Sequence, residues 1–177
     1  MNSIILYGSC YGTSMRYAQS LAEQTGLRCV SYDQAPSLRD YDRLFYVGGL
    51  YAGGVWGLSA ALKKLPADSH TELILLTVGL ADPEDPKNRE NIKASVQKQI
   101  PDRIFQRTQI FYLRGGIDYQ KLNFKHRTMM KMLYLKVKKT PSDQQSAETK
   151  AMIETYGQTV DFVDFNRLNQ VIEQFSL

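Results

Sequence analysis

The amino-acid sequence predicts an α/β fold in which helices cover both faces of a parallel sheet. Five apolar, strand-like segments are separated by connections long enough for helices, as parallel strands require. One of them, Leu73–Val78, is apolar throughout, which is typical of a central strand buried on both faces. Another, Ser3–Gly8, breaks abruptly into a loop of small and hydroxyl residues before an amphipathic segment begins. These observations together favour a doubly covered parallel sheet.

Strand and helix signals alternate along the chain. The strands are expected at Ser3–Gly8, Leu27–Tyr32, Arg43–Val47, Leu73–Val78 and Gln109–Leu113. The helices are expected at Thr13–Gln24, Leu58–Leu65, Arg89–Ile100, Phe124–Val137, Ala147–Tyr156 and Asp164–Phe175. Gly26 and Pro66 are suitable stops for the first two helices, and Asn123 is a suitable N-cap for the helix at Phe124. The last helix is expected to pack back onto the sheet.

Length and composition indicate one domain over residues 1–177, with no repeat or linker. No apolar run approaches the roughly 20 residues of a membrane span, and no basic leader precedes the first strand, so a cytoplasmic location is expected. Cys10 and Cys29 suit a reducing compartment and form no disulfide framework. Because His70 and His126 are far apart in sequence, no metal site is expected.

The positive charge of the chain is concentrated in one segment, 114–145, which is expected to be a basic helical insert after the fifth strand. The formal net charge is +4, and no acidic residue occurs between Asp118 and Asp143. The bases in that window are Lys121, Lys125, Arg127, Lys131, Lys136, Lys138 and Lys139. Two interpretations stay open: an ordinary surface helix with solvated lysines, or a basic helix at 124–139 that lies on an anionic membrane surface. No nucleic-acid partner is expected.

Three unusual loops follow the first, third and fourth strands. Because the carboxyl ends of parallel strands lie at one edge of a sheet, these loops are expected to form a ligand site together. The first loop lacks the lysine of a P-loop and the G-x-G-x-x-G of a dinucleotide fingerprint. Hydroxyl groups and backbone N–H groups at a helix N-terminus can nevertheless bind a terminal phosphate. We therefore expect a phosphate-bearing ligand at this edge.

The first loop, Ser9-Cys10-Tyr11-Gly12-Thr13-Ser14, resembles the phosphate loop of flavodoxins, written T/S-x-T-G-x-T. Tyr11 stands where that family has threonine, and Ser14 replaces its final threonine. Within the flavodoxin-like proteins, Gly116-Ile117-Asp118-Tyr119 and the run from Asn123 to Met130 resemble the branch of menaquinone-dependent protoporphyrinogen oxidases. His126 stands where that branch usually has an acid.

The resemblance implies a flavodoxin-like three-layer sandwich with sheet order 2-1-3-4-5 and non-covalently bound FMN. The residues it assigns to the FMN phosphate are Ser9, Cys10, Tyr11, Gly12, Thr13 and Ser14. Those it assigns to the two sides of the isoalloxazine ring are Tyr51, Ala52, Gly53 and Trp56, within Leu50–Trp56, and Gly79, Leu80, Ala81 and Asp82. It implies electron or hydride transfer, with a redox partner or a quinone as acceptor and protoporphyrinogen oxidation as the best-known chemistry of the branch. No side chain is singled out as catalytic.

Two other functions stay open. Cys10 and Arg16 satisfy C-x5-R, the arrangement of low-molecular-weight phosphatases and arsenate reductases, in which a cysteine thiolate attacks phosphorus. Asp82-Pro83 or Asp85-Pro86 would then supply the acid. Alternatively, with Tyr11 at a hydroxyl position, the chain is a flavodoxin-fold binding module without a cofactor. A test of FMN binding distinguishes these two functions from the FMN-dependent redox function.

Overall fold

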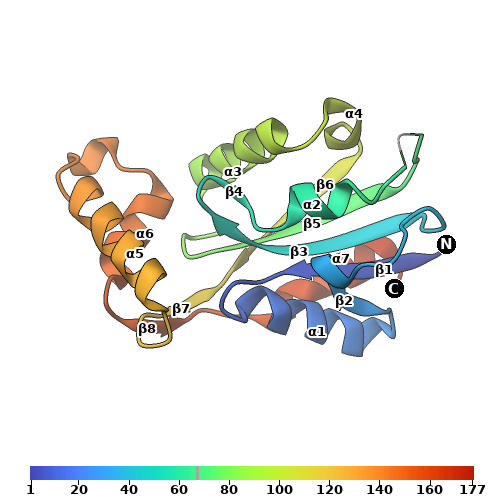
Figure 1. Cartoon of the computed structure of the whole chain (residues 1–177), viewed down its shortest axis with the longest axis horizontal. Helices are drawn as coiled ribbons and strands as arrows, with labels where there is room; N and C mark the ends of the chain where they lie inside the picture. Colours follow the sequence, from blue (N-terminus) through green and yellow to red (C-terminus); the bar gives the residue numbers. More distant parts are fainter. Residues whose placement is uncertain (67) are drawn as a thin grey trace.

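Five parallel strands form the main sheet of the computed structural model, in the order β2-β1-β3-β5-β6 (Figure 1). They are β1 (Ser3–Gly8), β2 (Cys29–Ser31), β3 (Arg43–Tyr51), β5 (Glu72–Gly79) and β6 (Thr108–Arg114). β5 and β6 are the fourth and fifth parallel strands along the chain, so the predicted order 2-1-3-4-5 is confirmed. The structure describes residues 1–66 and 68–177.

Helices cover both faces of this sheet, as predicted. On one face, apolar residues of α1 (Thr13–Thr25) and α7 (Asn169–Phe175) pack with Ile5, Phe45 and Ile74. On the other face, α2 (Leu58–Leu62), α3 (Pro86–Gln99) and α4 (Asp102–Phe105) pack with Ile4, Leu44 and Leu73. Successive strand residues point to opposite faces, which is why neighbouring positions such as 4 and 5 belong to different cores.

Several element boundaries differ from the predicted ones because local contacts extend or shorten them. β3 continues past Val47 to Tyr51 and folds back through an antiparallel pair with β4 (Gly54–Val55). α2 ends at Leu62 rather than Leu65. α3 begins at Pro86 rather than Arg89. The Asp85 side chain caps the helix by accepting hydrogen bonds from the N–H groups of Lys87 and Asn88, and proline suits the first helical position.

The C-terminal segment closes the α1 side of the sheet. The predicted helix at Asp164–Phe175 is a 3₁₀ turn, η3 (Phe165–Leu168), followed by α7. Leu168, Val171 and Phe175 are buried in the core shared with α1, so the expected packing onto the sheet is confirmed. Two further 3₁₀ turns occur, η1 (Tyr32–Gln34) and η2 (Ser142–Gln144).

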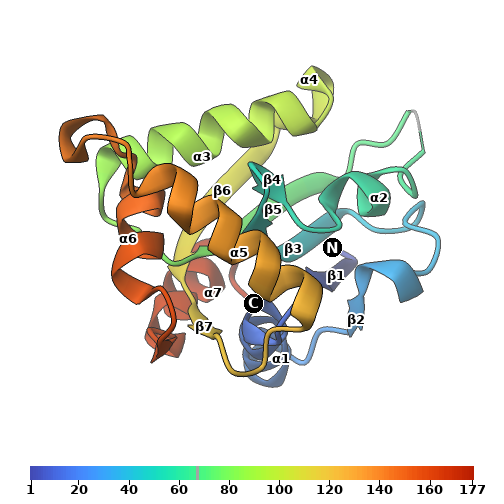
Figure 2. The same cartoon turned by 60° about the vertical axis from the view of Figure 1, so that its left-hand side comes forward.

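The insert after β6 is larger than the predicted 114–145. It contains β7 (Gly116–Asp118), α5 (Phe124–Val137), α6 (Ala147–Thr155) and β8 (Thr159–Asp161). β7 and β8 pair antiparallel, with Gly116 opposite Asp161, and this pairing brings the two ends of the insert together. Figures 1 and 2 show α5 and α6 beyond the carboxyl ends of the main strands, with α5 crossing that edge.

α5 coincides with the predicted helix, and the Asn123 side chain accepts a hydrogen bond from the backbone N–H of His126 as an N-cap. None of its residues is buried. Its wide apolar arc is therefore not core, in contrast to the helices on the sheet faces. In the part of the chain that the structure describes, no helix is both long and apolar enough to cross a bilayer.

Candidate functional site at the carboxyl edge of the sheet

The loop after β1 leads directly into α1. Gly12 is the N-cap of α1 and has a φ of 93°, in the left-handed region that glycine adopts without strain. Its N–H donates a hydrogen bond to the Ser9 hydroxyl at 2.9 Å. Among the described residues, no side chain caps the first turn of α1. The first backbone N–H groups of the helix, at residues 13–15, therefore remain available to an anion.

The hydroxyl residues of this loop lie between two other segments. Ser14 is buried, and a Cβ on Gly49 of β3 would lie 3.2 Å from its hydroxyl oxygen. The Thr13 hydroxyl donates a hydrogen bond to the Gly116 carbonyl at 3.4 Å. The loop after β1 is thus held between the end of β3 and the start of the insert.

The β3–β4 hairpin supplies Tyr51 and Trp56. The Trp56 N–H donates to the Gly49 carbonyl, and its own carbonyl accepts from the Tyr46 hydroxyl at 2.7 Å. A Cβ on Gly8 would lie 2.1 Å from that carbonyl oxygen, so only glycine permits this approach of the hairpin to β1. The Tyr51 and Trp56 rings meet edge to face at 4.9 Å. Two aromatic side chains therefore stand at the edge where the ring site was predicted.

The third loop, Gly79–Asp82, follows β5 and is held by the strand beside it. The Gly79 carbonyl accepts from the Gly115 N–H at 2.7 Å, and the Leu80 carbonyl accepts from Nε of Arg114 at 2.9 Å. The Asp82 carboxylate accepts from the Glu84 N–H and is engaged within its own loop. The strand register places Gly8 beside Gly48, and Gly49 beside Val78, so the three loops leave the sheet at one level.

α5 brings two residues to this edge that the site prediction did not include. The Tyr11 hydroxyl and Nδ1 of His126 form a hydrogen bond. The His126 ring lies 5.4 Å from the Tyr11 ring and 5.8 Å from the Tyr51 ring, between centroids. The Tyr51 hydroxyl also donates to the sulfur of Met129 at 3.5 Å. The sequence marks His126 as a departure from the family pattern, but it carries no signal for such long-range contacts.

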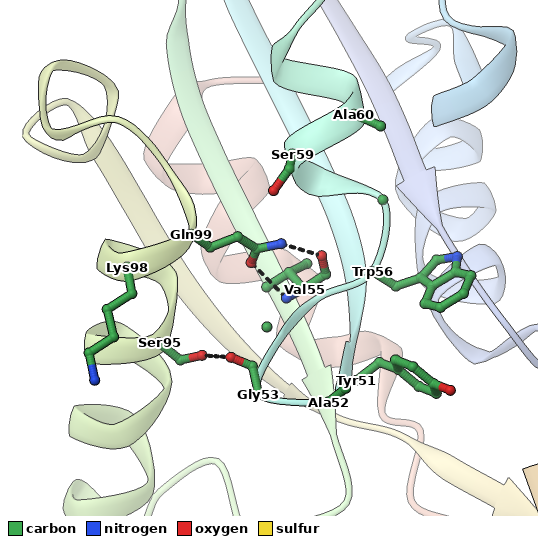
Figure 3. A pocket seen from close by; sticks show the side chains of 12 residues that line it. Tyr51, Ala52, Gly53, Val55, Trp56, Ser59, Ala60, Ser95, Lys98 and Gln99 are labelled. Atoms are coloured by element: carbon green, nitrogen blue, oxygen red, sulfur yellow. Dashed lines mark hydrogen bonds between the residues drawn. The ribbon is translucent and has the colours of Figure 1, made fainter.

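A cavity of about 530 Å³ overlaps the predicted site only in part, since Tyr51, Ala52, Gly53 and Trp56 line it (Figure 3). It lies between the β3–β4 hairpin and α3, where Gln99 bonds both the N–H and the carbonyl of Val55. Figure 3 shows the Tyr51 and Trp56 side chains directed away from it. The residues 9–14 and 79–82 do not line it. The structure therefore brings the three predicted loops to one edge, but His126 and Met129 contact Tyr51 there.

The C-x5-R residues are not arranged for phosphoryl transfer. Arg16 pairs with Asp161 of β8 at 2.8 Å, and its guanidinium lies 5.9 Å from the Phe165 ring. Desolvation raises the pKa of the Cys10 thiol, whereas an attacking thiolate requires a lowered one. Asp82 and Asp85 both accept backbone N–H groups near the start of α3. The phosphatase hypothesis is therefore not supported.

The residues at this edge fit a nucleotide phosphate and a flat ring. The N-terminal N–H groups of α1 and the Ser9 hydroxyl offer a phosphate site without a cationic side chain. Tyr51 and Trp56 offer aromatic surface within the same loop cluster. In the described part of the chain, no group of three or more histidine, cysteine or acidic residues is placed to hold a metal ion.

Comparison with known proteins gives a family match over most of the chain. The model of the flavodoxin domain family matches residues 4–145. A putative flavoprotein from Bacteroides uniformis is 12% identical, with a TM-score of 0.46 over 73% of this chain and 97% of that one. A mutant flavodoxin from Pseudomonas aeruginosa is 18% identical, with a TM-score of 0.38 over 75% of this chain and 93% of that one. No curated protein matches the sequence.

Proposed function

The chain belongs to the flavodoxin domain family, whose cofactor is flavin mononucleotide, and from this premise we propose that it is an FMN-dependent oxidoreductase. The observation that carries the proposal is the meeting of three loops at the carboxyl edge of the sheet, beside the uncapped first turn of α1. In such enzymes the bound cofactor supplies the electron or hydride transfer, and the protein supplies binding, orientation and electrostatics.

The residues assigned to the cofactor divide by chemistry. Ser9–Ser14 would hold the phosphate, through the N–H groups of the first α1 turn and the loop hydroxyls. The hairpin residues Tyr51–Trp56 would flank one side of the isoalloxazine, and Gly79–Asp82 its other edge. Gly12 gives the loop the left-handed N-cap conformation from which α1 begins, and the first N–H groups of a helix are directed beyond its N-terminus. His126 and Met129 of α5 both contact Tyr51 at this edge.

We further propose a protoporphyrinogen oxidase-like role with a quinone as electron acceptor. Both segments that carry the resemblance to that branch lie next to the candidate cofactor site. Gly116 accepts the hydrogen bond of Thr13, and the run from Asn123 to Met130 contains the two residues that contact Tyr11 and Tyr51. A substrate that approaches the cofactor at this edge would therefore meet the insert.

The outer face of α5 suits docking on an anionic membrane, where a lipid-soluble quinone resides. Phe124, Met132 and Leu135, here called the outer stripe, recur at helical spacing and are 85%, 68% and 52% exposed. Lysines at positions 125, 131, 136 and 138 flank the stripe on both sides. An exposed apolar stripe between lysines is typical of helices that lie in the membrane interface. We propose that the outer stripe docks the protein on the inner face of the membrane.

FMN binding is the direct test of the proposed function. The purified protein is expected to be yellow or to take up FMN, to quench its fluorescence, and to bleach with dithionite. The loaded protein is then expected to pass electrons from a reduced porphyrinogen to menadione, a soluble quinone. A colourless protein that cannot be loaded with FMN would contradict the flavin function. An FMN-loaded protein that reduces no quinone would contradict only the proposal that a quinone is the electron acceptor.

A further inference from the structure

Glu148 is a carboxylate that the insert places next to the Gly79–Asp82 loop. It lies in the first turn of α6, whose N-cap Ser146 accepts a hydrogen bond from the Thr149 N–H at 3.1 Å. Its Oε1 lies 3.9 Å from the position that a Cβ on Gly79 would take. Leu50, at the end of β3, contacts the same position. The Glu148 carboxylate of the insert thus lies close to the candidate ring site, next to Gly79, which has no side chain to separate the two.

The other carboxylates near this edge are engaged, and Glu148 is not. Asp161 pairs with Arg16, Asp118 pairs with Lys121 and accepts from the Thr159 hydroxyl, and Asp82 accepts a backbone N–H. Among the described residues, no hydrogen bond or ion pair involves the Glu148 carboxylate. Arg114, the cation on the neighbouring strand, donates to the Leu80 carbonyl and stacks at 3.8 Å on the Phe162 ring. Glu148 is therefore an exposed acid at this edge whose carboxyl group has no hydrogen-bond or ion-pair partner among the described residues.

The surroundings of Glu148 raise the pKa of its carboxyl group, while its exposure to solvent lets the group ionise near neutral pH. The Glu148 side chain is exposed to solvent, and desolvation by the protein atoms around it raises the pKa of its carboxyl group above the ordinary value. No neighbouring cation offsets that shift, although a place in the first turn of a helix favours a negative charge. Titratable groups with perturbed pKa values at a candidate binding site are frequently functional.

Resting on the proposed FMN function, we propose that Glu148 tunes the balance between oxidised and reduced cofactor through its negative charge beside the Gly79–Asp82 loop. Reduction of a flavin by two electrons with uptake of one proton adds one negative charge to it. A carboxylate nearby repels that added charge, so it favours the oxidised cofactor and lowers the midpoint potential. The insert thereby contributes an electrostatic group to the site as well as covering it.

The test compares the affinities of the protein for oxidised and dithionite-reduced FMN, together with the midpoint potential of the bound cofactor. In Glu148→Gln, affinity for reduced relative to oxidised FMN is expected to rise about tenfold, as removal of one nearby charge predicts. Glu148→Asp, which keeps the charge, is expected to stay close to the wild type. Glu154→Gln is the matched control, since Glu154 is likewise an exposed acid on α6 but has no atom among those close to Gly79.

Three outcomes overturn the proposal. A Glu148→Gln protein that binds FMN with an unchanged potential overturns the role of Glu148 and leaves the proposed function intact. An equal shift in Glu154→Gln shows a general effect of net charge and also overturns it. A wild-type protein that binds no FMN overturns both this proposal and the proposed function. Far-ultraviolet circular dichroism of each variant separates these effects from loss of the fold.

Discussion

The hydroxyl of Tyr11 and the Nδ1 atom of His126 form a hydrogen bond across 115 positions of the chain. Tyr11 belongs to the loop assigned to the FMN phosphate, and His126 to the first turns of α5. The centroid of the Tyr51 ring lies 5.8 Å from that of the same imidazole. One histidine of the insert therefore joins the loop assigned to the phosphate to the hairpin assigned to the ring.

Replacement of this histidine is expected to loosen the cover over the site. In His126→Ala, α5 loses its contacts with Tyr11 and Tyr51, so FMN is expected to bind and leave several-fold faster. Stopped-flow fluorescence of FMN measures both rates. His70→Ala is the control, because the other histidine is exposed and lies near Arg107, among residues assigned no cofactor role. Equal rates of FMN exchange in the wild type and His126→Ala would contradict the hypothesis that His126 holds α5 over the site.

Alanine variants of the two glycines at the ends of α1 are expected to distinguish an effect on stability from an effect on cofactor binding. Gly12 and Gly26 have φ values of 93° and 71°, and a Cβ on either would meet no atom within 4 Å. Alanine at either position is expected to lower the free energy of unfolding by about 1 kcal/mol, through backbone strain alone. Only Gly12→Ala is expected to weaken FMN binding, by about tenfold, since it distorts the loop that directs N–H groups to the phosphate.

Urea unfolding and FMN titration of both variants give the comparison. Gly26→Ala is the control, because it is expected to lower stability without changing the loop at Ser9–Ser14. If both variants bound FMN as tightly as the wild type, the loop at Ser9–Ser14 would not be the phosphate site.

The two cysteines are expected to react very differently with a thiol reagent. Cys29 is half-buried, and this burial raises the pKa of its thiol to about 11. Cys10 is exposed, and desolvation raises the pKa of its thiol less strongly. The thiolate is the reactive form, so labelling of the native protein is expected at Cys10 alone and to accelerate about tenfold per pH unit below its pKa. In denaturant both cysteines are expected to react.

Mass spectrometry of the labelled protein reads out this pattern. Fast labelling of Cys10 at pH 6 would indicate a lowered pKa and restore the phosphatase hypothesis. The expected slow labelling at that pH is instead typical of a cysteine that serves only to build the loop.

Membrane docking is expected to depend on the outer stripe of α5. The triple variant Phe124→Ser, Met132→Ser and Leu135→Ser loses three exposed apolar side chains, each of which stabilises the bound state by about 1.5–3 kcal/mol when fully buried in lipid. Binding to phosphatidylglycerol vesicles is therefore expected to fall at least 100-fold. Binding of the wild type is expected to weaken with salt, since ions screen the lysines from the anionic headgroups.

Vesicle flotation measures this binding. Phe165→Ser is the matched control, because Phe165 is an exposed apolar residue outside the insert, in η3. No flotation of the wild type with anionic vesicles at low salt would contradict membrane docking. Equal loss in the control would assign the effect to hydrophobicity in general rather than to α5.

The main elements of the fold were predictable because their signals are local. β1 and α5 have the predicted bounds. α1 extends one residue past the predicted Gln24, and the predicted stop, Gly26, is its C-cap and donates its N–H to the Ala22 carbonyl. Alternating burial and capping side chains operate within a few residues, so a sequence displays them directly. The start of α3 was also signalled, by Asp85 before Pro86, and the predicted start at Arg89 overlooked that cap.

The insert was predictable as a helix but not as a unit. β7 and β8 contribute three residues each, too few for a hydrophobic pattern, and their partners lie about 40 positions apart in the chain. Their pairing extends the insert to Asp161 and directs α6 toward Gly79. The place of Glu148 at the site therefore depends on a contact that no short stretch of sequence specifies.

The parallel sheet and the strand that each loop follows could be read from the sequence alone, and the sequence predicts a phosphate site at Ser9–Ser14. Those properties follow from periodicity and from turn chemistry within single segments. Tertiary packing alone shows that α5 crosses the candidate site, with His126 in contact with Tyr11 and Tyr51, and that its apolar arc stays unburied. Helix formation is governed by neighbours along the chain, whereas the surface that a helix covers is governed by packing between distant segments.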